Sequence, residues 1–437
     1  MIQEVYRRYE DYKKTDSLWY DETPNHWQTG RVKDFVVFNT TIKTPINFDE
    51  NSLVEFVPMT NVDDELGKIK EFNFVPLKEV SSGYTKFRNG DVIFAKITPC
   101  MENGNSAIVA GLKHNICFGS TEFMVFRASR KLTNKYLRYF LHNELFRRNA
   151  EPFMKGTAGQ KRIGSHYMAI HFFSLPPIPE QKSIADYLDT KTTQIDKKVH
   201  LLTQKSAHYS KLKQSLINET VTRGLDKTVP MKDSGIEWIG DIPEHWGVSA
   251  ITNITSTISI KNHPKEELLS VYRDYGVIIK SMRDDNHNKA GANLSNYKLV
   301  EAGYLVINKM KAWQGSLGVS EFRGIVSPAY ITCKTDKKIV ERSYLHHLLR
   351  CRNYINEYNR LSYGVRVDQW DMRYDDFKYV PVLLPPKKEQ KSIADYLDDK
   401  TAKIDTIVKT INTQIEHLKE LRKTLINDVV TGQIKVI

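Results

Sequence analysis

The chain repeats one stretch of its own sequence almost unchanged, and this repeat constrains its fold more than any other feature. Residues 180–189 (EQKSIADYLD) recur letter for letter at 389–398, a shift of 209 positions. The match continues without a gap over 48 residues, from Leu175 to Thr222 in the first copy and from Leu384 to Thr431 in the second. A match of this length indicates an internal duplication, so the chain holds two copies of one unit.

Weaker similarity extends the duplication to the residues that precede each repeated stretch. The tetrapeptide at 24–27 (PNHW) matches 243–246 (PEHW), residues 90–96 resemble 303–309, and residues 136–141 resemble 344–349. The shift between these matches drifts, which places insertions and deletions in this part of each copy. We therefore expect variable globular segments at 1–174 and 226–383, each followed by a nearly invariant helical segment at 175–225 and 384–437.

The globular segments are expected to be mixed α+β domains. Short apolar or alternating runs bounded by Gly, Pro and Asn predict strands at 54–59, 91–97 and 122–128, and at 305–310 and 329–334 in the second copy. Residues 135–148 carry apolar side chains at helical spacing. Several strands followed by a helix are typical of an α+β domain.

The repeated segments are expected to form long helices. Apolar residues follow a 3–4 alternation from Leu397 to Val429, and less regularly from Leu188 to Leu216. A helix of about 42 residues is about 63 Å long, longer than a globular core, so its seam needs another long helix. The expected partner is the other copy, in an antiparallel coiled coil with pseudo-two-fold symmetry. Homodimerisation through each helix separately is the alternative.

Charge and composition favour a polyanion as partner. The 437-residue chain has a net charge of +12, and residues 127–162 contain ten basic and two acidic side chains. The alternative is that the positive net charge serves only to keep the protein soluble. No apolar run reaches the roughly 18 residues of a membrane helix, and the charged start is unlike a signal peptide. Four cysteines far apart are typical of a reducing compartment, so a cytoplasmic protein is expected.

Motifs of catalysis are missing from the sequence. It contains no phosphate-binding G-x-x-x-x-G-K-[ST] loop, no Asn/Asp/Ser-Pro-Pro-aromatic tetrapeptide of an amino-methyltransferase, and no H-x-x-x-H metal pair. We therefore expect a non-catalytic chain that holds no metal or cofactor of its own.

Residues suited to DNA binding gather in two places in each copy. Glycine allows backbone N–H groups to approach phosphate closely, and Lys, Arg and Gln can bind phosphate or base edges. A glycine-bearing basic loop and its counterpart contribute Gly159, Gln160, Lys161, Arg162, Arg366, Gln369 and Trp370. The ends of two predicted strands contribute Lys96, Thr98, Lys309, Lys311, Trp313 and Gln314. The alternative for the loop is a solvated hinge, and the alternative for the strand ends is an ordinary surface turn.

At this point the chain resembles the DNA specificity subunits of type I restriction–modification systems. The resemblance rests on the twin LPPxxEQKSIADYLD stretches at 175–189 and 384–398, and on residues 233–246 (DSGIEWIGDIPEHW). It implies that residues 1–174 and 226–383 are target-recognition domains, each reading one half of a split, asymmetric DNA site. A coiled coil of about 63 Å would let the two domains address about 18 base pairs.

The resemblance also implies partner subunits. Two methyltransferase subunits would bring S-adenosylmethionine, and restriction subunits would use ATP and Mg²⁺ to translocate DNA. The helical segments would then act as spacer and methyltransferase dock. The partner-binding candidates on them are Ile184, Tyr187, Leu188, Ile195, Ile393, Tyr396, Leu397 and Ile404. One alternative is a DNA-reading subunit whose partner combines methyltransferase and nuclease in one chain. The other is a coiled-coil scaffold that binds only protein.

Overall fold

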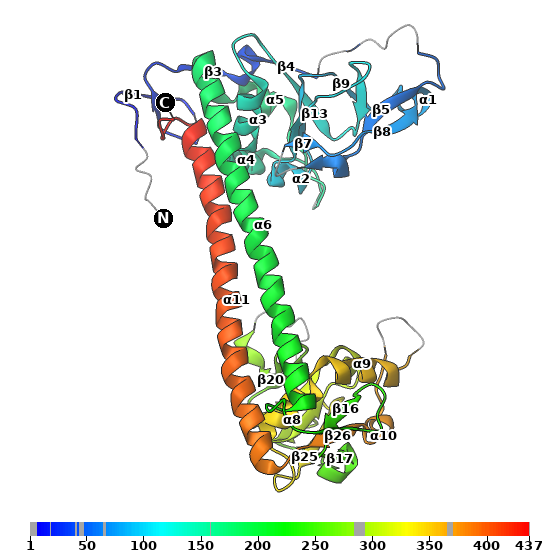
Figure 1. Cartoon of the computed structure of the whole chain (residues 1–437). Helices are drawn as coiled ribbons and strands as arrows, with labels where there is room; N and C mark the ends of the chain where they lie inside the picture. Colours follow the sequence, from blue (N-terminus) through cyan, green and yellow to red (C-terminus); the bar gives the residue numbers. More distant parts are fainter. Residues whose placement is uncertain are drawn as a thin grey trace. The chain divides into compact units, whose positions relative to one another are not determined.

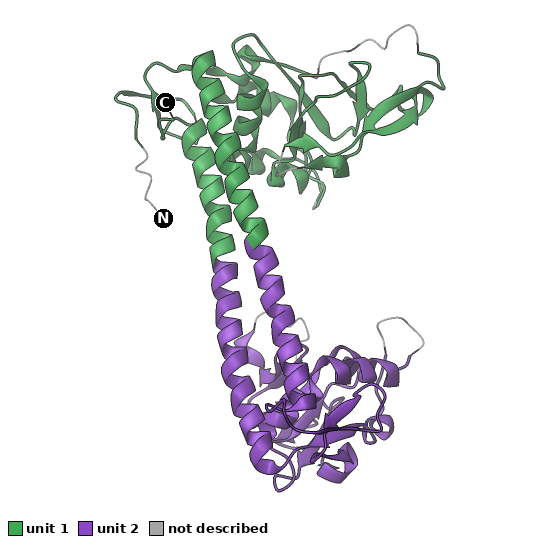
Figure 2. Cartoon of the chain, viewed as in Figure 1, with its two compact units in different colours: residues 1–201, 414–437 green, residues 202–413 purple. Residues whose placement is uncertain are grey.

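The chain forms two compact units, which Figure 2 shows in different colours. The computed structural model describes residues 7–17, 19–39, 42, 48–63, 67–157, 159–283, 293–364 and 370–436. Unit 1 consists of Met1–Leu201 and Gln414–Ile437, and unit 2 of Leu202–Thr413. Each unit therefore combines one globular segment with parts of both repeated segments.

Two long helices account for the repeated segments, as the sequence predicted. Helix α6 runs from Ile178 to Arg223, and helix α11 from Lys387 to Val430 (Figure 1). Each begins next to a Leu-Pro-Pro sequence that ends the strand before it. Proline has no N–H for a strand ladder and disfavours helical backbone in the residue before it, so this tripeptide separates strand from helix.

Within each unit the two long helices pack antiparallel. In unit 1, Arg422 Nε lies 3.0 Å from Asp196 Oδ1. In unit 2, Lys213 Nζ lies 2.6 Å from Asp405 Oδ2, and the Ser206 hydroxyl donates to Asn412 Oδ1 at 3.2 Å. From Ser206 to Lys213 the chain advances seven residues on α6, and from the partner Asn412 to the partner Asp405 it goes back seven residues on α11. This is the register of an antiparallel pair.

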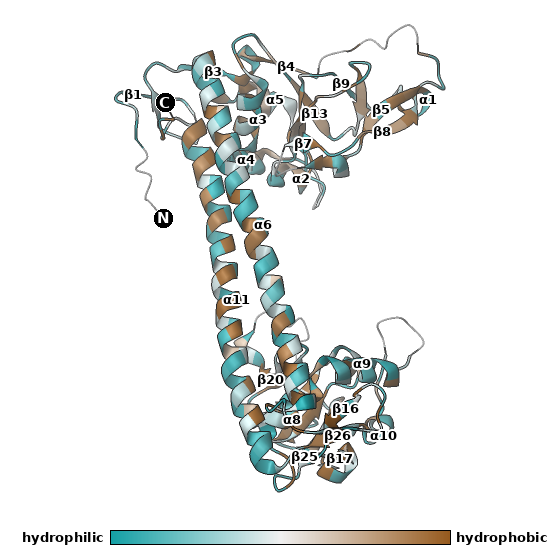
Figure 3. Cartoon of the chain, viewed as in Figure 1, coloured by the Kyte–Doolittle hydropathy of each residue, from teal (hydrophilic) through white to brown (hydrophobic). Residues whose placement is uncertain are grey.

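The apolar seam of α11 lies where its heptad pattern predicted. The 3–4 positions from Leu397 to Val429 are buried or half-buried, whereas most positions between them are exposed. Figure 3 shows polar and apolar residues alternating along both helices. In each unit the seam is therefore covered by the other helix of the same chain, and pairing with a second chain is not required.

Unit 1 contains two four-stranded sheets. The antiparallel sheet has the order β11-β10-β13-β4, with strands Ser106–Ile108, Val92–Ala95, Phe123–Ala128 and Val36–Phe38. The other has the order β8-β5-β12-β9, with strands Asn73–Pro76, Leu53–Val57, Cys117–Gly119 and Thr85–Phe87, of which β5 and β12 are parallel.

Short strand pairs and helices complete unit 1. The pairs are β1–β2 (Tyr12–Lys14, Glu22–Pro24), β3–β14 (Gln28–Arg31, Phe172–Leu175) and β6–β7 (Val62–Asp63, Lys68–Ile69). The α-helices are α1 Leu77–Val80, α2 Cys100–Asn103, α3 Asn134–His142, α4 Glu144–Ala150 and α5 Ser165–Ile170. Short 3₁₀ helices are η1 Val32–Asp34, η2 Met59–Asn61 and η3 Glu151–Phe153.

Unit 2 repeats most of this plan. Its four-stranded sheet, β18-β25-β22-β23, is formed by Thr255–Thr257, Ile331–Thr335, Leu305–Ile307 and Leu317–Val319. The strand pairs are β15–β16 (Met231–Asp233, Asp241–Pro243), β17–β26 (Gly247–Ala250, Pro381–Leu384), β19–β20 (Leu269–Tyr272, Gly276–Ile279) and β21–β24 (Lys298–Val300, Gly324–Val326). The helices are α7 Ile251–Ile254, α8 Arg342–Leu349, α9 Arg352–Leu361, α10 Tyr374–Phe377, η4 Lys280–Met282 and η5 Ala312–Gln314.

The helix expected at 135–148 is broken into α3 and α4. Asn143 is extended between them (φ −61°, ψ 128°), and its side-chain oxygen accepts the backbone N–H of Phe146 at 3.2 Å. Asparagine at a helix start satisfies an N–H group that has no partner within the helix, so this residue favours a new helix over continuation of the first. The predicted amphipathic stretch is correct, but its continuity is not.

A carboxylate at the start of each long helix anchors the globular segment to it. In unit 1, Glu180 accepts from Trp27 Nε1 at 3.0 Å and lies 2.8 Å from His26 Nε2. In unit 2, Glu389 makes the same two contacts with Trp246 and His245, at 3.1 and 2.8 Å. These contacts explain why the Glu of each repeat and the two PxHW sequences are retained together.

The neighbouring glutamines hold the turn before α3 and α8. The Gln181 amide donates to the carbonyl oxygens of Lys131 and Pro176, both at 2.8 Å, and its oxygen accepts the N–H of Thr133 at 2.8 Å. Gln390 makes the equivalent contacts in unit 2. Both side chains are buried, so removing them would leave backbone groups without partners.

The two ends of the described chain meet in unit 1. The backbone N–H of Lys435 donates to the carbonyl of Arg7 at 2.7 Å, and the Tyr12 hydroxyl donates to the carbonyl of Gly432 at 2.8 Å. In unit 2 the chain runs on without a break at the equivalent place, after Gly224. Within the described ranges, no helix carries an apolar stretch long enough to cross a bilayer.

Two buried histidines make the stability of unit 1 dependent on pH. Burial lowers the pKa of His171 to about 4. Burial beside Arg138, Arg147 and Arg422 also holds the pKa of His142 well below its usual value. Both side chains are therefore neutral in the folded unit, whereas in the unfolded chain they bind protons below pH of about 6.5.

We expect the free energy of unfolding of unit 1 to fall as the pH drops from 7 to 5.5. Each of these histidines contributes a slope of up to about 1.4 kcal/mol per pH unit below about 6.5. The substitution His171→Phe keeps the ring that packs on Trp19 and removes one titrating group, so it should flatten the dependence. Hydrogen exchange of α3 amides measures this, and the exposed His166→Gln is the matched control. An unchanged slope in His171→Phe would contradict the assignment.

Candidate nucleic-acid interface

A hairpin loop in unit 1 sits on the end of strand β10. Lys155 and Arg162 exchange backbone hydrogen bonds of 3.0 and 2.8 Å that close the loop. Thr98, just beyond β10, donates its backbone N–H and its hydroxyl to the carbonyl of Lys161, both at 3.0 Å. The N–H of Ile163 donates to the carbonyl of Lys96 at 2.9 Å. The structure thus brings the strand-end and loop candidates of unit 1 together.

The glycines of this loop are required by its backbone. Gly156 has φ +136°, and a Cβ atom there would lie 2.6 Å from the carbonyl oxygen of Gln160. Gly159 has φ +81°, at the exposed tip. Conformations with positive φ disfavour residues with a Cβ, so glycine permits the tight turn. The turn leaves the side chains of Gln160 and Lys161 exposed.

Arg162 is held by an acidic side chain. Its Nε and Nη2 lie 2.9 and 2.8 Å from the two carboxylate oxygens of Glu122, a bidentate contact that lowers the pKa of that carboxyl. Glu122 lies next to β13, whose neighbour in the sheet is β10. Since its charge is already paired, we assign Arg162 to positioning the loop, and Gln160 and Lys161 to its outward-facing surface.

Unit 2 builds the same arrangement from different side chains. The N–H of Met372 donates to the carbonyl of Lys309 at 3.0 Å, as Ile163 does to Lys96. Tyr363 and Asp371 exchange the backbone hydrogen bonds that close the second loop, at 3.3 and 3.0 Å. The Lys309 ammonium lies 2.9 Å from Asp371 Oδ2. The candidates Arg366 and Gln369 lie outside the described residues.

The remaining candidates of unit 2 surround an aromatic pair. The rings of Trp313 and Trp370 lie 5.1 Å apart between centroids. Lys311 is exposed, and Gln314 is half-buried at the end of η5. In unit 2 the strand end and the second loop therefore also meet through two indole rings tilted by 58°, whereas in unit 1 they meet through Thr98 and the backbone of the loop.

The structure adds residues that the sequence did not single out. A hollow of about 390 Å³ beside Lys96 is also lined by Asn39, Tyr84 and Lys86. Lys86 belongs to β9 and Asn39 follows β4, so sheet pairing brings them to Lys96 from distant parts of the chain. The sequence signal that could have indicated Tyr84 and Lys86 is the short run of aromatic and basic residues at 84–86, which is not part of a repeated motif.

Most of the partner-binding candidates lie inside the chain. Ile184, Leu188, Ile393 and Leu397 have no exposed surface, and Ile404 is buried in the helix seam. Ile195 is half-buried against the core of unit 1. Their heptad spacing serves intramolecular packing, so these side chains offer no docking surface to another protein. Tyr187 and Tyr396 are partly exposed, each beneath a lysine ammonium 5.6 Å from its ring centre.

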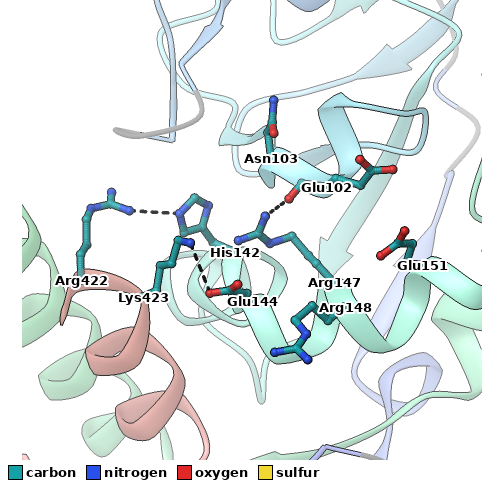
Figure 4. Close-up of a pocket in the computed structure, with 9 residues that line it drawn as sticks. All are labelled: Glu102, Asn103, His142, Glu144, Arg147, Arg148, Glu151, Arg422 and Lys423. Atoms are coloured by element: carbon teal, nitrogen blue, oxygen red, sulfur yellow. Dashed lines mark hydrogen bonds and ion pairs between the residues drawn. The ribbon is translucent and has the colours of Figure 1, made fainter. Parts of the chain in front are cut away.

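A hollow of about 340 Å³ in unit 1 joins α11 to α3, α4 and α2 (Figure 4). Arg422 Nη1 donates to His142 Nε2 at 3.2 Å, and the Lys423 ammonium lies 3.8 Å from Glu144 Oε2. Four basic and three acidic side chains line it, so their charges almost cancel. We therefore assign this hollow to the attachment of α11 and not to DNA binding.

Comparison with known proteins identifies the family of the chain. The model of the type I restriction modification DNA specificity domain matches twice, at residues 24–205 and 243–417. Together the two matches cover most of the sequence. The chain therefore belongs to the type I restriction–modification DNA specificity family, as its repeated motifs indicated.

Curated relatives agree with this assignment. The chain is 35% identical over 164 residues to the type I restriction enzyme EcoAI specificity subunit of Escherichia coli, an alignment that covers 37% of this chain and 27% of that protein. The EcoEI specificity subunit of the same species is 31% identical over the same coverage, so the chain spans about a quarter of the length of these two relatives. The putative MjaX specificity subunit of Methanocaldococcus jannaschii is 22% identical, over 98% of this chain and 97% of its own length.

Solved structures confirm the fold class. A chain from a study of complex assembly and conformational transition of the type I R-M system matches with a TM-score of 0.73 and 18% identity, over 94% of this chain and 99% of its own length. The HsdS subunit from Thermoanaerobacter tengcongensis matches with a TM-score of 0.57 and 19% identity, over 96% and 100%. The α+β segments and long helices expected from the sequence are thus the fold of this family.

Substitutions at the contact between Arg162 and Glu122, and at Lys161, test which residues position the loop and which bind DNA directly. We expect Glu122→Gln to weaken binding to the target DNA about tenfold, about 1.4 kcal/mol, because the loop loses its anchor although the chain becomes more positive. Lys161→Gln should weaken binding to all sequences alike and reduce the salt dependence by about one phosphate contact. Titration of target and unrelated duplexes at several salt concentrations measures both effects. The exposed Glu79→Gln, which changes charge equally, is the control; equal effects of both glutamate variants would disprove the positioning role.

Proposed function

We propose that the chain is the non-catalytic DNA-reading subunit of a type I restriction–modification complex and recognises a bipartite, asymmetric DNA site. The supporting observation is that both units place a hairpin loop on the end of an equivalent strand, through the same backbone contact from Ile163 to Lys96 and from Met372 to Lys309. The exposed side chains on this shared scaffold differ between the units. Two unlike reading surfaces on one repeated scaffold suit two unequal half-sites.

The partners follow from the same proposal. Two methyltransferase subunits would bring S-adenosylmethionine to the two half-sites, and restriction subunits would bring ATP and Mg²⁺. The duplication of the helical segments supports two binding positions for one kind of subunit. The basic excess of residues 127–162 supports double-stranded DNA as the ligand.

The long helices would set the number of unread base pairs between the half-sites. Support comes from their seam, in which polar contacts fix the register. Lys213 with Asp405, and Arg422 with Asp196, are equivalent positions of the duplication, 209 residues apart. Polar pairs at a coiled-coil seam specify alignment, because a shifted register would leave the charges unpaired.

Exchange of one globular segment tests whether the units read independently. Replacing residues 17–174 by the corresponding segment of another specificity subunit should change one half of the recognised site and leave the other half unchanged. Sequencing of methylated bases in the host genome gives both halves at once. The reciprocal exchange of residues 227–383 is the matched control, and a change in both halves after either exchange would refute independent reading.

Lengthening the helices tests their role as a spacer. One extra turn within residues 190–205 of α6 needs a matching turn within 413–428 of α11, since the antiparallel register must be kept. About 6 Å of added rise should lengthen the gap by about one to two base pairs and leave both half-sequences unchanged. The turn inserted in α6 alone is the control and should abolish site-specific methylation. An unchanged gap in the double insertion would rule out the spacer role.

A further inference from the structure

The hollow beside Lys96 in unit 1, which we call the Lys96 hollow, presents nitrogen donors and no carboxylate. It has a volume of about 390 Å³ and adjoins the base of the hairpin loop, since Lys96 both lines it and accepts the N–H of Ile163. Asn39 and Lys86 supply the other nitrogen donors, and none of the described residues that line the hollow is Asp or Glu. Its charge therefore favours an anion as ligand.

The sheet orients the amide of Asn39 so that it can only donate to a ligand. Its Oδ1 accepts the backbone N–H of Val125 at 3.0 Å, and its own backbone N–H donates to the Val125 carbonyl at 2.9 Å. Because a backbone N–H is a donor, the side-chain atom that it meets must be the amide oxygen. The NH₂ group of this exposed residue has no partner within the described part of the chain. It is the group left to bind a ligand.

The ammonium of Lys96 is not neutralised by any residue that the structure describes. The carbonyl of Glu122 accepts the N–H of Lys96 at 2.9 Å, but both carboxylate oxygens of Glu122 bind Arg162. Lys96 is half-buried, and Glu122 and Ile163 hold its backbone from both sides. A charge that is fixed in place before the ligand arrives loses little freedom on binding.

The opposite wall of the hollow is also held in place. Lys86 Nζ lies 5.4 Å from the centre of the Phe118 ring, a cation–π contact that restricts the lysine. Tyr84, which is 41% exposed, packs edge-on against Phe56 with 5.3 Å between ring centres. Strand β9 thus brings an ammonium and a phenol hydroxyl to the Lys96 hollow.

Unit 2 has lost the Asn39 donor at the equivalent position. Val125 lies opposite Ile93 in the first sheet, and Thr332 lies opposite the matching strand residue in the second. The backbone N–H of Ile258 donates to the Thr332 carbonyl at 2.9 Å, as that of Asn39 does to Val125. Isoleucine therefore stands where unit 1 has an amide, and its side chain offers no hydrogen bond to a ligand.

The charge at the loop end is reversed between the units. Arg162 closes the loop of unit 1 and binds Glu122, whereas Asp371 closes the loop of unit 2 and binds Lys309 with 2.9 Å between Oδ2 and Nζ. The carboxylate thus neutralises the loop in unit 1 and the strand end in unit 2. Lys96 and Lys309 occupy equivalent strand ends, but only the first offers an unpaired charge within the described residues.

A phosphate of the DNA backbone is the anion that fits this place. The non-bridging oxygens of a phosphodiester only accept hydrogen bonds, so they match a group of donors. A hollow cannot reach a base edge, which lies on the floor of a groove, whereas the phosphates form the raised edge beside it. A loop that enters the groove brings its own base against that edge, and the Lys96 hollow adjoins the base of the loop.

We propose that the Lys96 hollow binds one phosphodiester group of the DNA backbone, and that the equivalent place in unit 2, with Ile258 and Lys309, does not. The inference rests on the proposed function and adds an asymmetry to it. The half-site read by unit 1 is held by a backbone contact that the other half-site lacks, so its binding depends more strongly on salt.

Substitution of Lys96 tests the contact in the assembled complex of the full-length chain with its methyltransferase subunit. Titration with the target duplex at several salt concentrations should show that Lys96→Gln reduces the salt dependence by about one phosphate contact and weakens binding about tenfold. Lys96→Arg keeps the charge and should retain the salt dependence. The exposed Lys78→Gln in α1 removes one charge elsewhere in unit 1 and is the matched control. Circular dichroism and thermal unfolding verify that all variants fold.

Duplexes with a single uncharged methylphosphonate locate the contact. At one position of the unit 1 half-site, which exchange of residues 17–174 identifies, the methylphosphonate should weaken wild-type binding about tenfold and leave the binding of Lys96→Gln unchanged. If Lys96→Gln stays as sensitive as the wild type at every position, or changes the methylated sequence instead, the phosphate contact is wrong. If Lys309→Gln abolishes the effect of a methylphosphonate in the other half-site, the asymmetry is wrong.

The same titrations separate this inference from the function on which it rests. A wild-type complex that prefers its target to unrelated duplexes, together with unaltered phosphate sensitivity in Lys96→Gln, would reject the Lys96 hollow and keep the DNA-reading function. A complex that binds all duplexes equally, but loses one phosphate contact in Lys96→Gln, would keep the hollow as a backbone site and reject sequence-specific reading.

Discussion

A carboxylate at the start of each long helix, buried in unit 1 and half-buried in unit 2, makes the contact on which both units depend. Glu180 and Glu389 each bind a His-Trp pair from the beginning of their globular segment. A Trp N–H and a carboxylate placed in the same interior satisfy each other, and either one alone would be costly there. The contact fixes the orientation of the globular segment against the helix. The strand ends and loops elsewhere in the segment can therefore differ between the two units without changing this orientation.

The sequence predicted the fold class from two periodicities. The 209-residue repeat and the 3–4 spacing indicated two copies and two long antiparallel helices, and the structure has both within its units. It did not predict the break at Asn143, because local capping by one side chain competes with helix continuation and leaves little trace in hydrophobic spacing. Nor could spacing tell whether Ile184 and Leu188 face a core or a second protein, since both choices need the same apolar stripe.

The candidate interface was predicted in part. Strand ends and loops were chosen as separate candidates, and in each unit the structure joins them through a backbone hydrogen bond. The ion pair between Arg162 and Glu122 could not be foreseen, because the two residues are 40 positions apart and meet only through sheet pairing. The same holds for Tyr84 and Lys86 beside Lys96, which no motif connects.

The meeting of Arg7 and Lys435 in unit 1 has a consequence for synthesis on the ribosome. Leu425, Ile426, Val429 and Val430 belong to the core of unit 1, although they are translated after the whole of unit 2. Unit 2 is a continuous stretch of chain and can complete its core as it emerges, whereas unit 1 must wait for the last turns of α11. A stop codon directly after Thr413 would therefore leave unit 1 without part of its core, whereas every residue of unit 2 would still be made.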